Sequence, residues 1–549
     1  MLAATFFFFL LPLVRLFALS FFEGGTFDLS LYVRVLSEPR VRTGITNTIG
    51  IVAISTVLAV FIGLTEAWFV SYTDIRGKTI LHVLFILPFV IPSYITSLAW
   101  SRFLGPAGFL AQLTGWNIPT AFGYWGIVWV MGICHAPIAY MFCLNALQKI
   151  PREVEWAARC SGCGAWKTFL TVTLPCAMPG LAGGAMTVTL AGLDNFGIPA
   201  FLGGRRGINV LSTLIYQEIV GFGPSAFRRA ACLSFILSVM ALACCFILTK
   251  LLRSSGTLES LVPDKQSRCS LGNMRWKAET LIWTFVVVTS LFPLFSMVAT
   301  SMLRAYGLQF LPENLSLRNF VFLLNNPRAI GALRNSATLA LFTGCCALVT
   351  GSIAAWGRSR YPGSIFRAIE ASYALPYVLP GAVFALAMII AWIEPLPGWR
   401  PGIYGTATLL AITYVVRFSV LQLRATTSAL QQVDRSVDEA ARMCSASPWG
   451  RWGRVLIPLI TPGLIAGFFM TATHALTELT VSSILGSPGS ETIGMVILNF
   501  EQAGNVVVSS AFSTLVLGML ALFSLPVLCL RFHRNFSDSE TDKNTGGAT

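Results

Sequence analysis

The sequence predicts an all-α integral membrane protein of about twelve transmembrane helices, arranged as two parallel six-helix repeats. The first observation is composition: of 549 residues, 55% are hydrophobic and only 11% are charged, and the mean hydropathy is +0.71. Such a chain is too apolar for a soluble globular domain. The second observation is an internal repeat, because residues 146–184 and 429–467 match without a gap at 15 of 39 positions. Repetition on this scale indicates a duplicated unit.

Apolar runs of about 20 residues, the length that crosses roughly 30 Å of hydrocarbon, recur along the whole chain. A lipid-exposed backbone must satisfy its own hydrogen bonds, so these runs are expected to be helices. The first run could also be a signal peptide, but no charged segment precedes it, and we expect it to be retained as a span. The twelve expected spans lie near residues 4–22, 45–70, 80–101, 121–146, 179–202, 230–252, 279–301, 333–357, 366–392, 403–423, 460–485 and 507–530.

The second and third spans are repeated in the eighth and ninth, at an offset of 288 residues. Asn47 corresponds to Asn335, and residues 87–92 (LPFVIP) correspond to residues 375–380 (LPYVLP). The duplication therefore covers most of each half. Because six spans separate the two repeated loops, both loops are expected on the same side of the membrane, as in parallel repeats.

The formal net charge of +14 is explained by orientation in the membrane. If the repeated loops are cytoplasmic, the loops on their side hold 23 Lys and Arg residues and the opposite side holds 13. This is the bias of the positive-inside rule, and it places both termini in the cytoplasm. Membrane lipid is the expected surrounding, and no nucleic-acid partner is expected.

The domain organisation follows from the repeat. Between the halves the chain becomes polar and carries Pro and Gly, which is typical of a cytoplasmic linker between two once-separate units. The four expected parts are a first half over residues 1–252 with its repeated loop at 147–177, a linker at 253–278, a second half over 279–531 with its repeated loop at 424–459, and a polar tail at 532–549.

Each repeated loop is expected to form a short helix-turn-helix. In the second loop, residues 436–439 (SVDE) have the capping-box pattern that starts a helix. Gly162 and Ser445 are expected to close the first helix of their loops. Pro448 is expected to start another helix, and Pro458 to end it. Small residues suited to close docking fall on one helical face in each loop: Val154, Ala157, Ala158 and Ser161, and Val437, Ala440, Ala441 and Cys444.

These residues resemble the cytoplasmic coupling loop of type I ABC importer permeases, in which Glu-Ala-Ala is followed by Gly and later by Ile-Pro or Leu-Pro. Each copy departs once: the first has Trp156 at the Glu position, with Glu155 one residue early, and the second has Ser445 in place of Gly. The resemblance implies that the following residues belong to loops that dock on ATPase subunits: Glu155, Ala157, Ala158, Gly162, Pro175, Glu439, Ala440, Ala441, Ser445 and Pro458.

The resemblance extends over nearly the whole chain, and the fused two-permease form is similar to the iron(III) importer permeases. Residues 193–203 and 476–486 carry this narrower match. Fused permeases for thiamine and for phosphonates are also similar, so these cargoes stay open. The resemblance implies the type I ABC permease fold in the inner (cytoplasmic) membrane. It also implies two ATP-binding cassette subunits that carry ATP and Mg, and an extracytoplasmic solute-binding protein.

The unequal loops predict unequal coupling to the ATPase. We expect Glu439→Ala to impair coupling more than Glu155→Ala, because only Glu439 stands at the family's Glu position.

No catalytic motif is found, and no cofactor is expected on this chain. Residues 77–79 (GKT) match the end of a phosphate-binding loop, but Tyr72 stands where its first Gly is required. ATP hydrolysis is therefore expected from another polypeptide. Cys160 and Cys163 form a C-x-x-C pair without a second pair at zinc-finger spacing, so no metal site is expected. A membrane enzyme would require a clustered catalytic site, which the sequence lacks.

Ionisable residues inside spans cost at least about 2.5 kcal/mol each unless they face a cavity or a partner. Asp194 with Asn195, and Glu478 with His474, lie near the outer ends of corresponding spans. These four residues either line the translocation path or its outer gate, or pair with helix neighbours to fix packing. Glu66 is expected to extend toward the cytoplasmic surface. An ion-coupled secondary transporter stays a further alternative, although it gives no reason for two repeated loops.

Overall fold

The computed structural model describes residues 5–23, 26–116, 122–221, 225–253, 264, 266–361, 363–393, 402–445 and 447–522. These residues are almost entirely helical, which confirms the predicted fold class. The strands of the described part are β1 (Phe22–Glu23) and β2 (Thr26–Phe27), which form a small antiparallel hairpin. The predicted tail at 532–549 lies outside the described residues.

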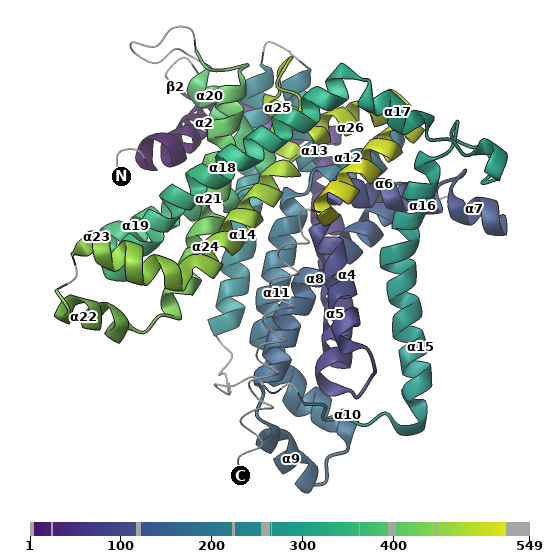
Figure 1. Ribbon diagram of the computed structural model, residues 1–549. Helices are drawn as coiled ribbons and strands as arrows, with labels where there is room; N and C mark the ends of the chain where they lie inside the picture. Colours follow the sequence, from purple (N-terminus) through teal and green to yellow (C-terminus); the bar gives the residue numbers. More distant parts are fainter. Residues whose placement is uncertain are drawn as a thin grey trace.

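The two halves contain similar series of helices (Figure 1). The first half holds η1 (Phe6–Leu10), α2 (Leu11–Phe21), α3 (Ser30–Ser37), α4 (Pro39–Tyr72), α5 (Lys78–Val90), α6 (Ser93–Leu104), α7 (Phe109–Thr114), α8 (Tyr124–Lys149), α9 (Arg152–Cys160), α10 (Ala165–Thr168), η3 (Phe169–Thr173), α11 (Leu174–Asp194), α12 (Gly197–Gly203), η4 (Gly204–Arg206), α13 (Leu211–Val220) and α14 (Ala226–Arg253). The second half holds η5 (Gly272–Met274), α15 (Arg275–Val286), η6 (Val287–Leu291), α16 (Phe292–Ser301), η7 (Pro312–Asn314), α17 (Arg318–Leu324), α18 (Pro327–Arg360), α19 (Ser364–Val378), α20 (Gly381–Trp392), α21 (Ala407–Gln431), α22 (Arg435–Met443), α23 (Pro448–Arg451), η8 (Trp452–Leu456), α24 (Ile457–Leu476), α25 (Thr480–Leu485), α26 (Ile493–Gln502) and a last helix, Val506–Leu522.

The apolar helices correspond to the twelve expected spans. Among the described residues, eight helices are long and apolar enough to cross a membrane as single helices, and two bent pairs raise the number to ten. Two shorter apolar helices, Phe6–Phe21 and Val506–Leu522, stand at the first and last expected positions. With each bent pair counted as one span, six candidate spans separate α9 from α22, as parallel repeats require.

The third and ninth spans are broken, so the expectation of continuous helices over 80–101 and 366–392 is wrong. Helix α5 meets the helical segment that follows it at 103°, and α19 meets α20 at 110°. The cause is the repeated second proline, because the residue before a proline is pushed out of the helical region. Ile91 before Pro92 has ψ 130°, and Leu379 before Pro380 has ψ 142°.

Equivalent three-helix groups form the centre of each half. Helices α4, α8 and α11 pack together in the first half, as α18, α21 and α24 do in the second. Close approach depends on glycine at equivalent positions: a Cβ on Gly63 would lie 2.5 Å from the backbone nitrogen of Tyr140, and one on Gly351 would lie 3.0 Å from that of Leu423. The repeated Asn47 and Asn335 both donate side-chain hydrogen bonds to loop carbonyls, those of Asn209 and Gly489.

The first span of each half packs on the other half. Segments η1 and α2 contact α19 and α20 of the second half, while α15, η6 and α16 contact α5 and α6 of the first. The predicted division at residues 253–278 therefore separates the halves in sequence but not in packing. The linker leads into α15, which lies along the first half.

A π-helical turn precedes a proline at four places in the described chain. Segments η1, η3, η6 and η8 each end two residues before a proline, namely Pro12, Pro175, Pro293 and Pro458. A proline removes one backbone donor and crowds the carbonyl four residues earlier, and a widened turn relieves both. The expectation that Pro458 ends a helix is therefore wrong, since the chain continues from η8 into α24.

Candidate functional site

The first repeated loop forms the predicted helix-turn-helix from α9 and α10. Its turn is at Gly162, whose φ of 83° lies in the left-handed region that favours glycine. Apolar side chains are exposed on this loop, with Trp156 at 56% and Trp166 at 72% exposure. Ala157 is exposed beside them, and Ala158 is half-buried. Exposed apolar groups on a polar loop are typical of a surface that binds another protein.

Glu155 points inward and is buried in its own chain. Its Oε1 accepts hydrogen bonds from the hydroxyls of Tyr72 and Thr173, each at 2.6 Å. Its Oε2 accepts one from Arg268 Nη1 at 3.1 Å, and the two charged side chains are only 6% and 5% exposed. The carboxylate therefore ties α9 to the ends of α4 and η3, and does not contribute to the exposed face of the loop.

The second loop starts differently from the prediction. The N-cap of α22 is Asp434, whose side chain accepts the Ser436 backbone N–H at 2.9 Å, so the expected capping box at 436–439 is wrong. Glu439 and Ala440 are exposed, and Ala441 is half-buried. The predicted restart at Pro448 is confirmed by α23. The two loops thus present equivalent faces, except that the first loop has the indole of Trp156 where the second loop has the carboxylate of Glu439.

Ser445 closes α22 in the left-handed region, with a φ of 56°. It stands at the position of Gly162 in the other loop, and a non-glycine residue in that conformation costs about 1 kcal/mol. We expect Ser445→Gly to stabilise the second loop by about that amount and Gly162→Ser to destabilise the first. Hydrogen exchange of residues 435–445 and 152–162 measures both, and equal exchange in variant and parent would contradict the prediction.

Glu155→Ala is expected to destabilise the first loop by about 2 kcal/mol, because the buried Arg268 then keeps only Asp264 as a counter-charge, at 3.2 Å, and the Tyr72 and Thr173 hydroxyls lose their acceptor. Glu439→Ala is expected to change stability by less than about 0.5 kcal/mol, since Glu439 is exposed. This is a ranking of loop stability, and the ranking of ATPase coupling expected from the sequence stays a separate prediction. Limited proteolysis of the purified variants measures loop stability, and equal cutting within the two loops would contradict the stability ranking.

An ion pair between a buried arginine and a partly exposed aspartate joins the halves at the second broken span. Arg417 on α21 donates from Nη2 to Asp194 Oδ2 at 2.8 Å and to Oδ1 at 3.0 Å. Its Nη1 donates to the carbonyls of Pro376 and Leu379, which the break in the helix leaves free, at 3.0 Å each. Asp194 also accepts the backbone N–H of Gly381 at 2.5 Å. We call Asp194, Arg417 and Gly381 the charged junction.

Any side chain at Gly381 would crowd the charged junction. A Cβ on Gly381 would lie 3.2 Å from Arg417 Nη2, 3.3 Å from Asp194 Oδ1 and 3.3 Å from Thr480 Cγ2. Thr480 begins α25, two residues after Glu478. The structure therefore brings the regions of Asp194 and Glu478, predicted as corresponding sites, to one place between the halves.

Asn195 and Glu478 have the same local role in the two halves. Asn195 Oδ1 accepts the backbone N–H of Ile198 at 3.0 Å, and Glu478 Oε1 accepts that of Val481 at 2.6 Å. Each caps the short helix, α12 or α25, that follows a main span. The expected spans at 179–202 and 460–485 thus end earlier, at Asp194 and Leu476. His474 Nδ1 lies 2.8 Å from the carbonyl oxygen of Met470.

Two further arginines connect the halves, and sequence reasoning did not find their role. Arg102 on α6 is 1% exposed and forms an ion pair with Glu501 of α26 at 2.5 Å. Arg15 on α2 donates to the carbonyl of Ala391 on α20 at 3.0 Å. The sequence did contain one indication, because a charged side chain inside an apolar span is energetically costly and therefore requires a partner. Glu66 shows the limit of that signal, because it is 6% exposed and does not reach the surface.

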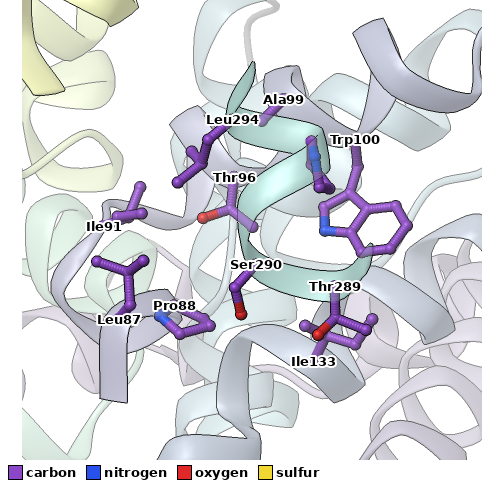
Figure 2. Close-up of a pocket in the computed structure, with 11 residues that line it drawn as sticks. Leu87, Pro88, Ile91, Thr96, Ala99, Trp100, Ile133, Thr289, Ser290 and Leu294 are labelled. Atoms are coloured by element: carbon purple, nitrogen blue, oxygen red, sulfur yellow. The ribbon is translucent and has the colours of Figure 1, made fainter. Parts of the chain in front are cut away.

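The first broken span lines a small pocket (Figure 2). It lies against α8 and the π turn η6, and it has a volume of about 10 Å³ for the centre of a water molecule, which is room for one. Its polar hydroxyls include those of Thr96 and Thr289, which already donate to the carbonyls of Pro92 and Phe285. The cavity is therefore too small and too apolar to hold a cargo. Its lining residues are Leu87, Pro88, Ile91, Thr96, Ala99, Trp100, Ile133, Thr289, Ser290, Pro293 and Leu294.

The sequence matches a family described as the binding-protein-dependent transport system inner membrane component, once over residues 55–254 and again over 347–537. The chain belongs to this family. The match covers both repeated loops and most of each half, so the permease is a duplicated transport subunit. It is a multi-pass membrane protein of a family whose members work with ATPase and binding-protein partners in general.

Relatives of the permease cover most of its length. It is 25% identical to the ferric transport system permease protein of Actinobacillus pleuropneumoniae, over 94% of this chain and 75% of that one. It is 22% identical to the Fe(3+)-transport system permease protein of Haemophilus influenzae, over 95% and 96%. A shorter match, 27% identical over 38% of this chain, is to a putrescine transport permease of Escherichia coli. A chain from the crystal structure of a bacterial ABC importer of alginate superposes with a TM-score of 0.38, at 17% identity, over 46% of this chain and 92% of that one.

Proposed function

We propose that this permease imports ferric iron into the cytoplasm, delivered by an extracytoplasmic binding protein and driven by two ATP-binding subunits that dock on α9 and α22. Ferric iron is proposed as the cargo because two relatives, matched over 94% and 95% of the chain, are both named as ferric or Fe(3+) transport permeases. The relative named for putrescine matches only 38% of the chain.

The two exposed coupling faces support docking of two ATPase subunits, one on each loop. In each loop the docking face is made of small residues beside one large side chain, Trp156 or Glu439. Closure of the ATPase subunits on ATP, bound with Mg, pushes both loops and rocks the halves apart on the far side. The free energy comes from different affinities of the two conformations for ATP and for the loaded binding protein.

The charged junction is the contact that opens in this cycle. Asp194 comes from the first half and Arg417 from the second, so relative rotation of the halves separates them. Asp194 is 39% exposed, which supports a carboxylate that is accessible from the proposed path. Glu478 lies at the equivalent end of the second half, beside the same junction, and lines the same path.

The topology of the proposal places both coupling loops and both termini in the cytoplasm, with the protein in the inner membrane. The loops on that side hold 23 Lys and Arg residues against 13 on the other, which supports this orientation.

Co-purification tests the proposed partnership. The tagged permease, extracted from its own membrane in mild detergent, is expected to retain an ATP-binding subunit at two copies per permease. Its vesicles are expected to accumulate cargo only with ATP. Purification without any ATPase, together with transport in vesicles that lack ATP, would contradict the proposal and favour an ion-coupled transporter.

A further inference from the structure

The second part of the linker is packed onto the first coupling loop. Arg268 donates from Nη1 to Glu155 Oε2 and to the Tyr72 hydroxyl, both at 3.1 Å, and from Nη2 to the carbonyl of Ile150 at 2.6 Å. Its guanidinium also lies 4.9 Å from the centre of the Tyr72 ring. A side chain that is 5% exposed and satisfied by four groups fixes its neighbours in one arrangement.

Asp264 binds the start of the same coupling helix. Its carboxylate forms an ion pair with Arg152, the first residue of α9, and its backbone N–H donates to the carbonyl of Gln148 at 2.8 Å. Arg152 Nη2 also donates to the carbonyl of Gln266 at 3.0 Å. The Arg152 guanidinium beside Asp264 lowers the pKa of that carboxyl to about 2, so the pair is ionised at neutral pH. The start and the first turn of α9 are thus held by linker residues.

The linker is also joined to the turn between α4 and α5. Cys269 donates its backbone N–H to the carbonyl of Tyr72 at 2.8 Å and forms a parallel bridge with Thr73. Asp74 accepts the backbone N–H of Leu271 at 3.0 Å and a 2.6 Å bond from Arg275, the first residue of α15. From there α15 runs along α5. The contacts therefore continue from α9 through the linker into the first span of the second half.

The second coupling loop is held differently. In the part of the chain that the structure describes, both α9 and α22 contact the helices of their own loop, α10 with η3 and α23 with η8, so the difference lies in the side chains that face the protein. Glu439 is exposed, whereas Glu155 is buried.

We propose that Asp264 and residues 266–275 form a brace, which joins the first coupling loop to α15 as one mechanical unit, with Arg268 as its central positioning residue. The inference rests on the proposed function, because it concerns how motion of a coupling loop is transmitted. An ATPase subunit that displaces α9 then moves the first span of the second half directly, while displacement of α22 acts within the second half alone.

Hydrogen exchange on the full chain tests the brace without any partner subunit. In Arg268→Ala, the amides of residues 148–160 are expected to exchange at least about tenfold faster, and those of 435–443 to stay unchanged. Arg268→Lys is expected to restore part of the protection. The matched control is Arg328→Ala, which removes an ion pair with Glu491 that lies in the second half, away from both loops. Unchanged exchange at 148–160 in Arg268→Ala would overturn the brace.

The ratio of cargo transported to ATP hydrolysed tests whether the brace transmits motion from the first coupling loop. In vesicles with the ATPase and the binding protein, Arg268→Ala and the milder Tyr72→Phe are expected to hydrolyse ATP while transporting less cargo per ATP. The loss is expected to be at least about fivefold for Arg268→Ala, with Arg328→Ala at the parent ratio. Faster exchange with an unchanged ratio would overturn the mechanical role. If the unaltered chain does not transport with ATP, the proposed function fails while the exchange result still decides the brace.

A covalent lock tests whether the brace moves as one unit. Thr73→Cys places a second thiol beside Cys269 at the parallel bridge, and mild oxidation is expected to join them, as detected by mass spectrometry of the linked peptides. If the brace stays closed throughout the cycle, the locked protein keeps at least about half of its transport rate. Loss of transport that reduction restores would show that the linker detaches in each cycle, which overturns the proposal.

Discussion

Asp194→Ala is expected to destabilise the protein by about 3–5 kcal/mol, because Arg417 is 3% exposed and loses its counter-charge in an apolar surrounding. Arg417→Met is expected to cost less, since Asp194 is 39% exposed and water can solvate the carboxylate that remains. The double variant Asp194→Ala/Arg417→Met removes both charges and is expected to be more stable than Asp194→Ala alone. Denaturant titration of the purified proteins in detergent measures the free energy of unfolding of the three variants and ranks them.

The control for this series is Arg328→Ala, whose ion pair with Glu491 has an arginine that is 65% exposed and is expected to contribute no more than about 1 kcal/mol. If the double variant is destabilised by the sum of the two single changes, the pair is not energetically coupled. In that case the charged junction would not hold the halves together.

Ala157→Glu and Ala440→Glu are each expected to abolish ATP-driven uptake while leaving the permease folded. Both alanines are exposed, so the new side chain meets water in the free protein and costs little. In the docked complex it would bury a charge in a close contact, at about 3 kcal/mol or more, which is a loss of affinity of about 100-fold or more.

The matched controls are Ala157→Ser and Ala440→Ser, which add one small polar atom at the same positions. They are expected to keep ATPase binding within about threefold of the parent, as measured by surface plasmon resonance with the permease in nanodiscs. Normal uptake in both Glu variants would show that the exposed faces of α9 and α22 are not the docking surfaces.

The helical spans and the duplication could be predicted because hydropathy and repetition are properties of contiguous sequence. The helix-turn-helix loops were predicted for the same reason, since Gly162, Ser445 and Pro448 act locally. The π turns were missed because Pro175 and Pro458 have the local signature of helix ends. A widened turn is an alternative response to the same missing donor.

The broken spans were visible as a repeated pair of prolines, at 87–92 and 375–380, but hydropathy alone hides a bend, because the residues on both sides are equally apolar. The exchange of first spans between the halves has no local signal at all. It depends on which surfaces of α2 and α16 fit α20 and α6, and that is decided only in the folded chain.

The partners of the charged residues were likewise not predictable from spacing. Arg417 lies 223 positions from Asp194, and only the energetic cost of an intramembrane charge indicated that each requires a partner. Glu155 is a different case, because its shift by one residue from the family's Glu position turns it about 100° around α9. That rotation was readable from the sequence and explains why Glu155 faces Tyr72 and Arg268, while Trp156 is exposed.

Uptake of radiolabelled ferric iron into proteoliposomes tests the central claim most directly. The vesicles contain the permease with its ATPase subunits, ATP and Mg inside, and iron-loaded binding protein outside. We predict accumulation that requires both ATP and the binding protein, that a non-hydrolysable ATP analogue abolishes, and that Ala440→Glu eliminates. Iron uptake that proceeds without ATP and follows an imposed proton or sodium gradient would contradict the account.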